Sequence, residues 1–127
     1  MTILILDDDI SRVKEFTQRT GFLPRHVFTV TDFIKAIEEY VPDIIILDHD
    51  LGDDQVNGTG NDAARWLAHN KIGTGDYQIS VIIWSLNPIG VANMVNHLKH
   101  ADHINCNVIP FGWAKVRMKD SNLEFTI

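Results

Sequence analysis

The chain is poor in cysteine and in long apolar runs. Its 127 residues include a single cysteine, Cys106, and one cysteine cannot form an internal disulfide. A fold without disulfides fits a reducing compartment such as the cytoplasm. No apolar stretch approaches the roughly 18 to 20 residues that a membrane span requires, and the amino terminus passes from a short apolar run directly into acids, unlike a signal peptide. The sequence therefore predicts a cytoplasmic protein that has no membrane partner.

Positive charge is also scarce. The chain holds 11 Lys and Arg against 17 Asp and Glu, which gives a formal net charge of -6 and a pI near 5.3. Proteins that bind long nucleic acids carry a basic surface, because phosphate contacts supply much of their affinity. We therefore expect no long nucleic acid as a partner, whereas a small phosphate ligand held through a metal ion fits the composition.

Internal repeats and low-complexity tracts are absent as well. The length suits one domain, residues 1–127, and the hydrophobic content of 45% suffices for one core without disulfide or metal staples. The fold therefore has to be predicted from the order of its apolar segments.

The most informative segment is residues 43–52, Asp-Ile-Ile-Ile-Leu-Asp-His-Asp-Leu-Gly. Apolar residues at successive positions indicate a strand that is covered on both faces, as in the centre of a parallel sheet. Open α/β folds bind their ligands at the carboxyl ends of such strands. The strand would therefore deliver Asp48, His49 and Asp50 to the edge of the sheet where chemistry is expected.

A second apolar run ends in the same way. Residues 2–6 are followed directly by Asp7, Asp8 and Asp9. If the two strands are parallel neighbours, their carboxylates converge, and crowded carboxylates keep their protons unless a cation lies among them. An all-oxygen set of ligands suits Mg²⁺ or a similar hard divalent cation. The alternative is that these aspartates only cap helices or form turns.

Strands and helices alternate along the rest of the chain. The pattern predicts further strands at residues 25–30, 79–84 and 104–109. It predicts helices at residues 11–19 and 31–40, and from residues 61 and 87 onward, with caps at Thr31-Asp32 and Asn61-Asp62. Such alternation implies right-handed crossovers. We predict an α/β, doubly wound, flavodoxin-like parallel five-stranded sheet of order 2-1-3-4-5.

Two segments do not fit this alternation. Residues 51–60 are rich in turn formers and predict a polar loop beside the acids that acts as a mobile cover. Residues 111–127 show no convincing helical run and end in an alternating, strand-like pattern. We expect irregular structure or an extra edge strand there, in place of a last helix.

Residues 85–90, Ser-Leu-Asn-Pro-Ile-Gly, follow the strand at 79–84. Asn87 is a favourable N-cap and Pro88 suits the first helical position. The free N–H groups of such a helix start attract phosphate, which makes Ser85 and Asn87 candidate phosphate ligands. The alternative is that Asn87 is only a cap.

Taken together, residues 2–112 resemble the receiver domain of two-component response regulators. The resemblance implies that Asp7 and Asp8 bind Mg²⁺ together with Asp48, which stands at the phosphoacceptor position, and that Ser85 takes the hydroxyl position. Ile109 stands before Pro110 and Phe111 where that family has lysine. An isoleucine has neither the charge nor the donors with which lysine pairs to phosphoryl oxygens.

The segments Asp48-His49-Asp50-Leu51-Gly52 and Ser85-x-Asn87-Pro88-x-Gly90 resemble a narrower group. They are similar to the receiver-like domains of phages and bacteria that are predicted to process cyclic phosphates. This resemblance implies a cyclic phosphate or cyclic nucleotide as ligand, and the host cytoplasm as the location if a phage encodes the chain.

Our hypothesis is a metal-dependent ring opening of a cyclic phosphodiester. Asp7, Asp8 and Asp48 would hold the ion, and His49 would transfer protons, because imidazole titrates near neutrality. Asp50 would orient His49 or bind the metal, and Ser85 and Asn87 would hold phosphate oxygens.

Three alternatives stay open. His49 could point into a layer of packed helices instead of toward the acids. The chain could be a non-catalytic module that binds a nucleotide, a phospho-ligand or a protein partner. It could also be a true receiver that is phosphorylated on Asp48.

Overall fold

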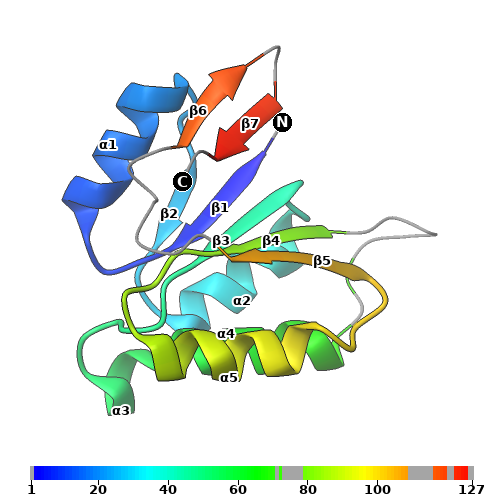
Figure 1. Ribbon diagram of the computed structural model, residues 1–127. Helices are drawn as coiled ribbons and strands as arrows, with labels where there is room; N and C mark the ends of the chain where they lie inside the picture. The colour runs from blue at the N-terminus through cyan, green and yellow to red at the C-terminus, as the bar shows by residue number, and fades with distance from the viewer. Residues whose placement is uncertain (1, 71, 73–78, 109–115, 120–121, 126–127) are drawn as a thin grey trace.

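The computed structural model describes residues 2–70, 72, 79–108, 116–119 and 122–125. Its centre is a parallel five-stranded sheet of order β2-β1-β3-β4-β5, which confirms the predicted flavodoxin-like topology (Figure 1). The strands are β1 (Ile3–Leu6), β2 (Arg25–Val27), β3 (Ile44–Leu47), β4 (Ile79–Ile83) and β5 (Ile104–Val108).

The register of the three middle strands places their carboxyl ends level with one another. Leu6 of β1 pairs with Leu47 of β3, and Leu47 pairs with Ile83 of β4. The residues that follow these strands therefore leave the sheet at the same height. We call this side the carboxyl edge.

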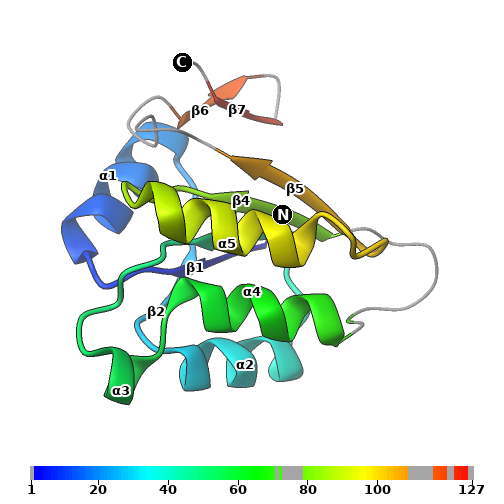
Figure 2. The same cartoon turned by 60° about the horizontal axis from the view of Figure 1, so that its bottom comes forward.

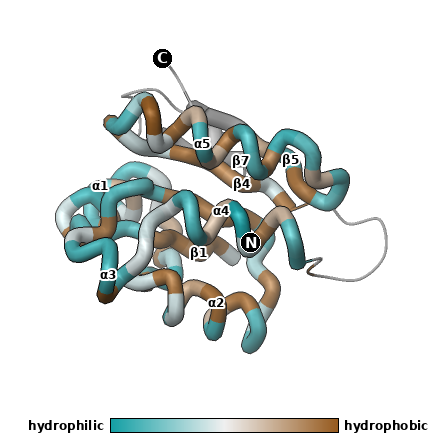
Figure 3. Tube along the Cα trace, turned by 90° about the horizontal axis from the view of Figure 1, so that it is seen from below, coloured by the Kyte–Doolittle hydropathy of each residue, from teal (hydrophilic) through white to brown (hydrophobic). Residues whose placement is uncertain are grey.

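Helices cover both faces of the sheet (Figures 1 and 2). One face carries α1 (Ile10–Thr20), and the other carries α2 (Val30–Glu39), α4 (Gly60–His69) and α5 (Pro88–Leu98). Helices α2, α4 and α5 each carry both hydrophobic and hydrophilic residues along their length (Figure 3), as expected of a helix that packs one side on a sheet. In the part of the chain that the structure describes, no helix is long and apolar enough to cross a membrane.

The core is divided by the sheet into two apolar clusters. The larger one lies under α2, α4 and α5, and the smaller one lies under α1, where Phe16 meets Trp84 edge to face with ring centroids 6.0 Å apart. Strands β1 and β3 contribute to both clusters, and Ile5, Ile45 and Ile46 are completely buried. Burial on both faces explains why their sequences are apolar at successive positions.

Two helix starts differ from the prediction. The N-cap of α2 is Thr29, whose Oγ1 accepts the N–H of Asp32, and the N-cap of α4 is Thr59, which forms a capping box with Asp62. The predicted caps at residues 31–32 and 61–62 were therefore wrong by two residues. In both places a threonine precedes an aspartate by three residues, the spacing at which the two side chains can satisfy the helix end.

The loop over residues 51–60 contains a short helix that was not predicted, α3 (Asp54–Asn57), capped by Asp53. Asn57 Nδ2 donates to the carbonyl of Leu51, which is itself fully buried. These hydrogen bonds close the loop on itself, and the buried Leu51 anchors its first residue in the core.

After β5 the described residues form the hairpin of β6 (Val116–Lys119) and β7 (Asn122–Phe125). The hairpin is a separate two-stranded sheet and not an extra edge strand of the main sheet. It lies beside α1 (Figure 1). Ile109 and Pro110, where the sequence departs from the receiver pattern, lie outside the described residues.

Candidate functional site

Asp7, Asp8 and Asp48 meet at the carboxyl edge. Each offers one carboxylate oxygen, and these oxygens all lie within 4.8 Å of one another. The level ends of β1 and β3 explain the convergence, because Asp7 and Asp48 are the first residues after the paired Leu6 and Leu47. Asp7 and Asp48 are buried and Asp8 is exposed, so this acid cluster is closed at its base and open to solvent on the side of Asp8.

Burial gives the acid cluster unusual proton affinities. Burial raises the pKa of Asp7 above its ordinary value, although the N–H of Asp9 and the charge of Arg12 oppose this shift. Burial and then the neighbouring charge of Asp7 raise the pKa of Asp48 to about 7. Three oxygen ligands with this electrostatic strain fit a hard divalent cation such as Mg²⁺, which would relieve the repulsion between them.

Arg12 lies between the two buried carboxylates, and the sequence analysis did not identify it. Its Nη1 is 3.1 Å from Asp7 Oδ2 and 3.4 Å from Asp48 Oδ2, and its Nη2 is 3.7 Å from Asp9 Oδ2. A signal for it was present in the sequence. Side chains of a helix tilt toward its amino terminus, so an arginine in the first turn of a helix that follows Asp9 reaches back to the carboxyl edge.

His49 is held by its neighbour Asp50. Its Nδ1 lies 2.8 Å from Asp50 Oδ1, and its side chain is 16% exposed. Because a carboxylate only accepts hydrogen bonds, this contact places a hydrogen on Nδ1, and in the neutral form of the ring the lone pair is then on Nε2. Of the two predicted roles of Asp50, this contact fits the orientation of His49. In the described residues the group of close metal-ligand atoms includes neither Asp50 nor His49.

The ring of His49 packs against Gly90 in the first turn of α5. A β-carbon at residue 90 would stand 2.5 Å from both Cδ2 and Cγ of the ring. The imidazole therefore lies against a helix, as one alternative held, and that part of the helix is at the carboxyl edge.

The backbone at Gly60 also lies very close to the backbone of Asp48 and His49. A β-carbon there would overlap the carbonyl oxygen of Asp48, and the N–H of Gly60 donates to the carbonyl of His49 over 2.8 Å. The start of α4 thus fixes the backbone that carries Asp48 and His49.

Asn87 and Ser85 are engaged in local contacts. Asn87 Oδ1 accepts the N–H of Gly90 over 2.9 Å, which confirms its role as N-cap, and Asn87 Nδ2 lies 3.5 Å from Asp50 Oδ1. The N–H of Asn87 donates to Ser85 Oγ over 3.1 Å, and Ser85 is 7% exposed. Among the described residues no acceptor takes the hydroxyl hydrogen of Ser85. Asn87 links α5 to the pair of His49 and Asp50.

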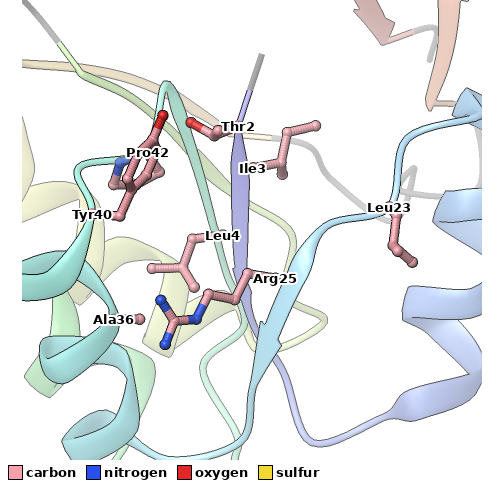
Figure 4. A pocket seen from close by; sticks show the side chains of 8 residues that line it. All are labelled: Thr2, Ile3, Leu4, Leu23, Arg25, Ala36, Tyr40 and Pro42. Atoms are coloured by element: carbon pink, nitrogen blue, oxygen red, sulfur yellow. The ribbon is translucent and has the colours of Figure 1, made fainter.

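A separate hollow lies at the amino ends of β1 and β2. Thr2, Arg25 and Tyr40 are among the residues that line it (Figure 4). Thr2 precedes β1 and Asp7 follows it, so this hollow and the acid cluster are at opposite ends of the same strand. It is no part of the candidate site.

Comparisons with known proteins agree with this geometry. The model of the cyclic-phosphate processing receiver domain matches residues 2–100. A signal receiver domain from Vibrio parahaemolyticus has a similar structure, with 26% sequence identity, a TM-score of 0.58, and coverage of 84% of this chain and 77% of that one.

A CheY-like response regulator receiver domain from Methylobacillus flagellatus is also similar, with 16% identity, a TM-score of 0.59, and coverage of 87% of this chain and 85% of that one. This second likeness concerns the fold alone. No curated protein matches the sequence. The family match covers most of the chain and includes both segments that meet at the carboxyl edge, and the chain therefore belongs to the cyclic-phosphate processing receiver domain family.

Proposed function

We propose that the carboxyl edge binds a cyclic phosphate or cyclic nucleotide together with one divalent cation and opens the phosphate ring. The single observation that carries this proposal is the placement of the acid cluster and the pair of His49 and Asp50 at the same edge of the sheet, where Asp48 directly precedes His49 in the chain. The first supplies ligands for a cation, and the second supplies a group for proton transfer. The description of the matching family supports the choice of ligand.

Asp7, Asp8 and Asp48 would hold Mg²⁺ or a similar ion. When bound, such an ion neutralises the phosphate and lowers the pKa of a coordinated water. The three carboxylates would fix it at the base of the site, since two of them are buried and cannot turn away into solvent.

His49 would act as the general base through Nε2, because its Nδ1–H is committed to Asp50. A water molecule gives one proton to Nε2 while its oxygen forms a bond to phosphorus. The bond between phosphorus and one ring oxygen breaks, and that oxygen takes a proton from solvent. The attacked phosphorus becomes a phosphomonoester, the released ring oxygen becomes a hydroxyl group, and Nε2 returns its proton to solvent. Ser85 would donate its hydroxyl hydrogen to a non-bridging phosphate oxygen.

Exposed apolar side chains at the carboxyl edge support a ligand that is larger than phosphate. Leu86 is 57% exposed and Ile89 is 75% exposed, and both belong to the segment between β4 and the first turn of α5. Binding becomes more favourable when a ring of the ligand covers exposed leucine and isoleucine, because apolar surface is removed from water. A nucleobase would provide such a ring, which favours a cyclic nucleotide.

A turnover assay tests this proposal. The purified protein would be incubated with Mg²⁺ and a panel of cyclic mononucleotides and cyclic oligonucleotides, and the products separated by chromatography. We expect ring-opened product from at least one of these compounds, and loss of turnover in Asp48→Asn and His49→Ala. Stoichiometric binding without product would instead identify a binding module.

Phosphorylation on Asp48 is the second candidate function. The resemblance to solved receiver domains favours it, and Asp48 is the first residue after the central strand, as a phosphoacceptor should be. The isoleucine at residue 109 argues against it, because the family cation that pairs with phosphoryl oxygens is lost. Labelling by acetyl phosphate that depends on Asp48 would support this candidate.

A further inference from the structure

Arg12 is the one arginine in the described residues that contacts two members of the acid cluster. A single nitrogen, Nη1, reaches Oδ2 of Asp7 at 3.1 Å and Oδ2 of Asp48 at 3.4 Å. Its side chain is 17% exposed and the two carboxylates are nearly inaccessible. This positive charge therefore compensates two buried negative charges in a poorly hydrated place, where ion pairs are strongest.

The remaining oxygens of these carboxylates are already in use. Asp7 Oδ1 accepts the N–H of Asp9 over 2.8 Å, and Asp48 Oδ1 accepts the N–H of His49 over 2.9 Å. In the described residues the two Oδ2 atoms accept no backbone hydrogen bond, so we expect a cation that binds between Asp7 and Asp48 to approach them, where Arg12 already lies. Arg12 and the divalent cation compete for the same pair of oxygens.

We propose that Arg12 is an exchangeable counter-ion, which a divalent cation displaces from Asp7 and Asp48 and which then binds the phosphate of the ligand. Both halves of this statement rest on the cation site of the proposed function, and neither half requires the ring-opening reaction. A guanidinium and a divalent cation repel each other at contact distance, so both cannot stay between the two carboxylates.

The position of Arg12 allows the displaced side chain to serve the ligand. Residue 12 is in the first turn of α1, and its neighbours Asp9 and Ser11 are at the solvent side of the carboxyl edge. A long arginine side chain that leaves the acid cluster from this point remains beside it. Its fork of N–H donors matches two oxygens of a phosphate group. Arg12 would thereby supply the positive charge that the lysine of receiver domains supplies, since this chain has isoleucine at residue 109 in place of that lysine.

The metal half is tested without any phosphate ligand. Mn²⁺ would be titrated into the full chain by calorimetry, with Arg12→Gln compared to wild type. We expect Arg12→Gln to bind Mn²⁺ about tenfold tighter, since the competitor is gone. The matched control is Arg19→Gln, because Arg19 lies on the same helix and pairs with Glu15 on the surface at 2.9 Å. This control should bind Mn²⁺ as the wild type does. Equal or weaker Mn²⁺ binding by Arg12→Gln overturns the exchange.

The phosphate half uses inorganic phosphate at saturating Mg²⁺. We expect Arg12→Gln to lose at least about tenfold in phosphate affinity, and Arg12→Lys to recover part of that loss, whereas Arg19→Gln behaves as wild type. Unchanged phosphate affinity in Arg12→Gln, or no phosphate binding by the wild type, overturns this half. If Arg12→Gln does not fold, Arg12→Met, which also removes the competing charge, replaces it in both titrations.

The outcomes separate this proposal from the ring-opening reaction. If both titrations follow the expected pattern but no cyclic phosphate is turned over, the role of Arg12 stands and the reaction fails. If turnover is observed and neither affinity depends on Arg12, the reaction stands and the exchange fails.

Discussion

The imidazole ring of His49 lies so close to Gly90 that a β-carbon at residue 90 would stand 2.5 Å from two ring carbons. His49 follows β3 and Gly90 belongs to α5, so this contact joins the two sequence segments that define the candidate site. Glycine is therefore required at residue 90 because a larger side chain would collide with the ring of His49, and not because of the backbone conformation of a turn.

Replacement of Gly90 by alanine should therefore displace the ring of His49. We expect Gly90→Ala to lower the free energy of unfolding by about 1 to 3 kcal/mol through overpacking, even though alanine favours a helix more than glycine does. Chemical denaturation measures the loss. In a double-mutant cycle, His49→Ala should restore stability to Gly90→Ala. An equal loss in both backgrounds would show that the ring is not the obstacle.

The pH dependence of stability should report Asp48. Its pKa of about 7 in the folded protein exceeds the ordinary value of 3.8, so the folded state binds this proton more tightly than the unfolded state. Stability is therefore greatest below pH 4 with respect to this group, and falls as the pH rises from about 4 to about 7. The slope is at most about 1.4 kcal/mol per pH unit. The raised pKa of Asp7 acts in the same direction.

Thermal unfolding of metal-free protein at pH 5 and pH 8 tests this prediction. The melting temperature should be lower at pH 8, and Asp48→Asn should reduce the difference. Mg²⁺ at pH 8 should raise the melting temperature of the wild type, since the ion binds only the folded chain. If wild type and Asp48→Asn show the same pH dependence, Asp48 does not titrate in this range.

Replacement of Asp50 should lower turnover without changing the affinity for the metal ion. Its carboxylate contacts His49 and is not in the acid cluster. We expect Asp50→Ala to lower kcat about 10- to 100-fold, as loss of an orienting partner does, and to leave Mn²⁺ affinity unchanged. Asp53→Asn is a matched control, because Asp53 caps α3 and asparagine caps equally well. A parallel loss of Mn²⁺ binding in Asp50→Ala would make Asp50 a metal ligand instead.

Leu86 and Ile89 should matter for a nucleotide and not for phosphate. The double variant Leu86→Ser and Ile89→Ser removes exposed apolar surface at the carboxyl edge. We expect about tenfold weaker binding of a cyclic nucleotide and unchanged binding of inorganic phosphate. Leu23→Ser is the control, since Leu23 is 88% exposed and lines the hollow at the amino ends of the strands. If wild type, the double variant and Leu23→Ser all bind the nucleotide with equal affinity, its base does not contact Leu86 and Ile89.

The sequence predicted the sheet and the convergence of its acids because both depend on simple periodicity. A strand that is covered on both faces has to be apolar throughout, and parallel neighbours have to end at one edge. Asp7, Asp8 and Asp48 could therefore be placed together from residue order alone.

Features that depend on three-dimensional fit were not predicted. Arg12 stands three residues past the cap of α1, and only the direction of side chains in that turn brings it between Asp7 and Asp48. The contact of Gly90 with His49 joins segments that are 41 residues apart in the chain. The hairpin of β6 and β7 was predicted only as a strand, because its alternation does not specify its partner.

The most direct test of the account is a calorimetric titration of the full chain with Mn²⁺, comparing wild type with Asp8→Asn and Asp9→Asn. Asp8 is the exposed member of the acid cluster, whereas Asp9 caps α1 and asparagine retains that cap. The account predicts one ion per chain, at least about tenfold weaker binding in Asp8→Asn, and nearly wild-type binding in Asp9→Asn. Absence of binding in the wild type, or equal binding in Asp8→Asn, would contradict it.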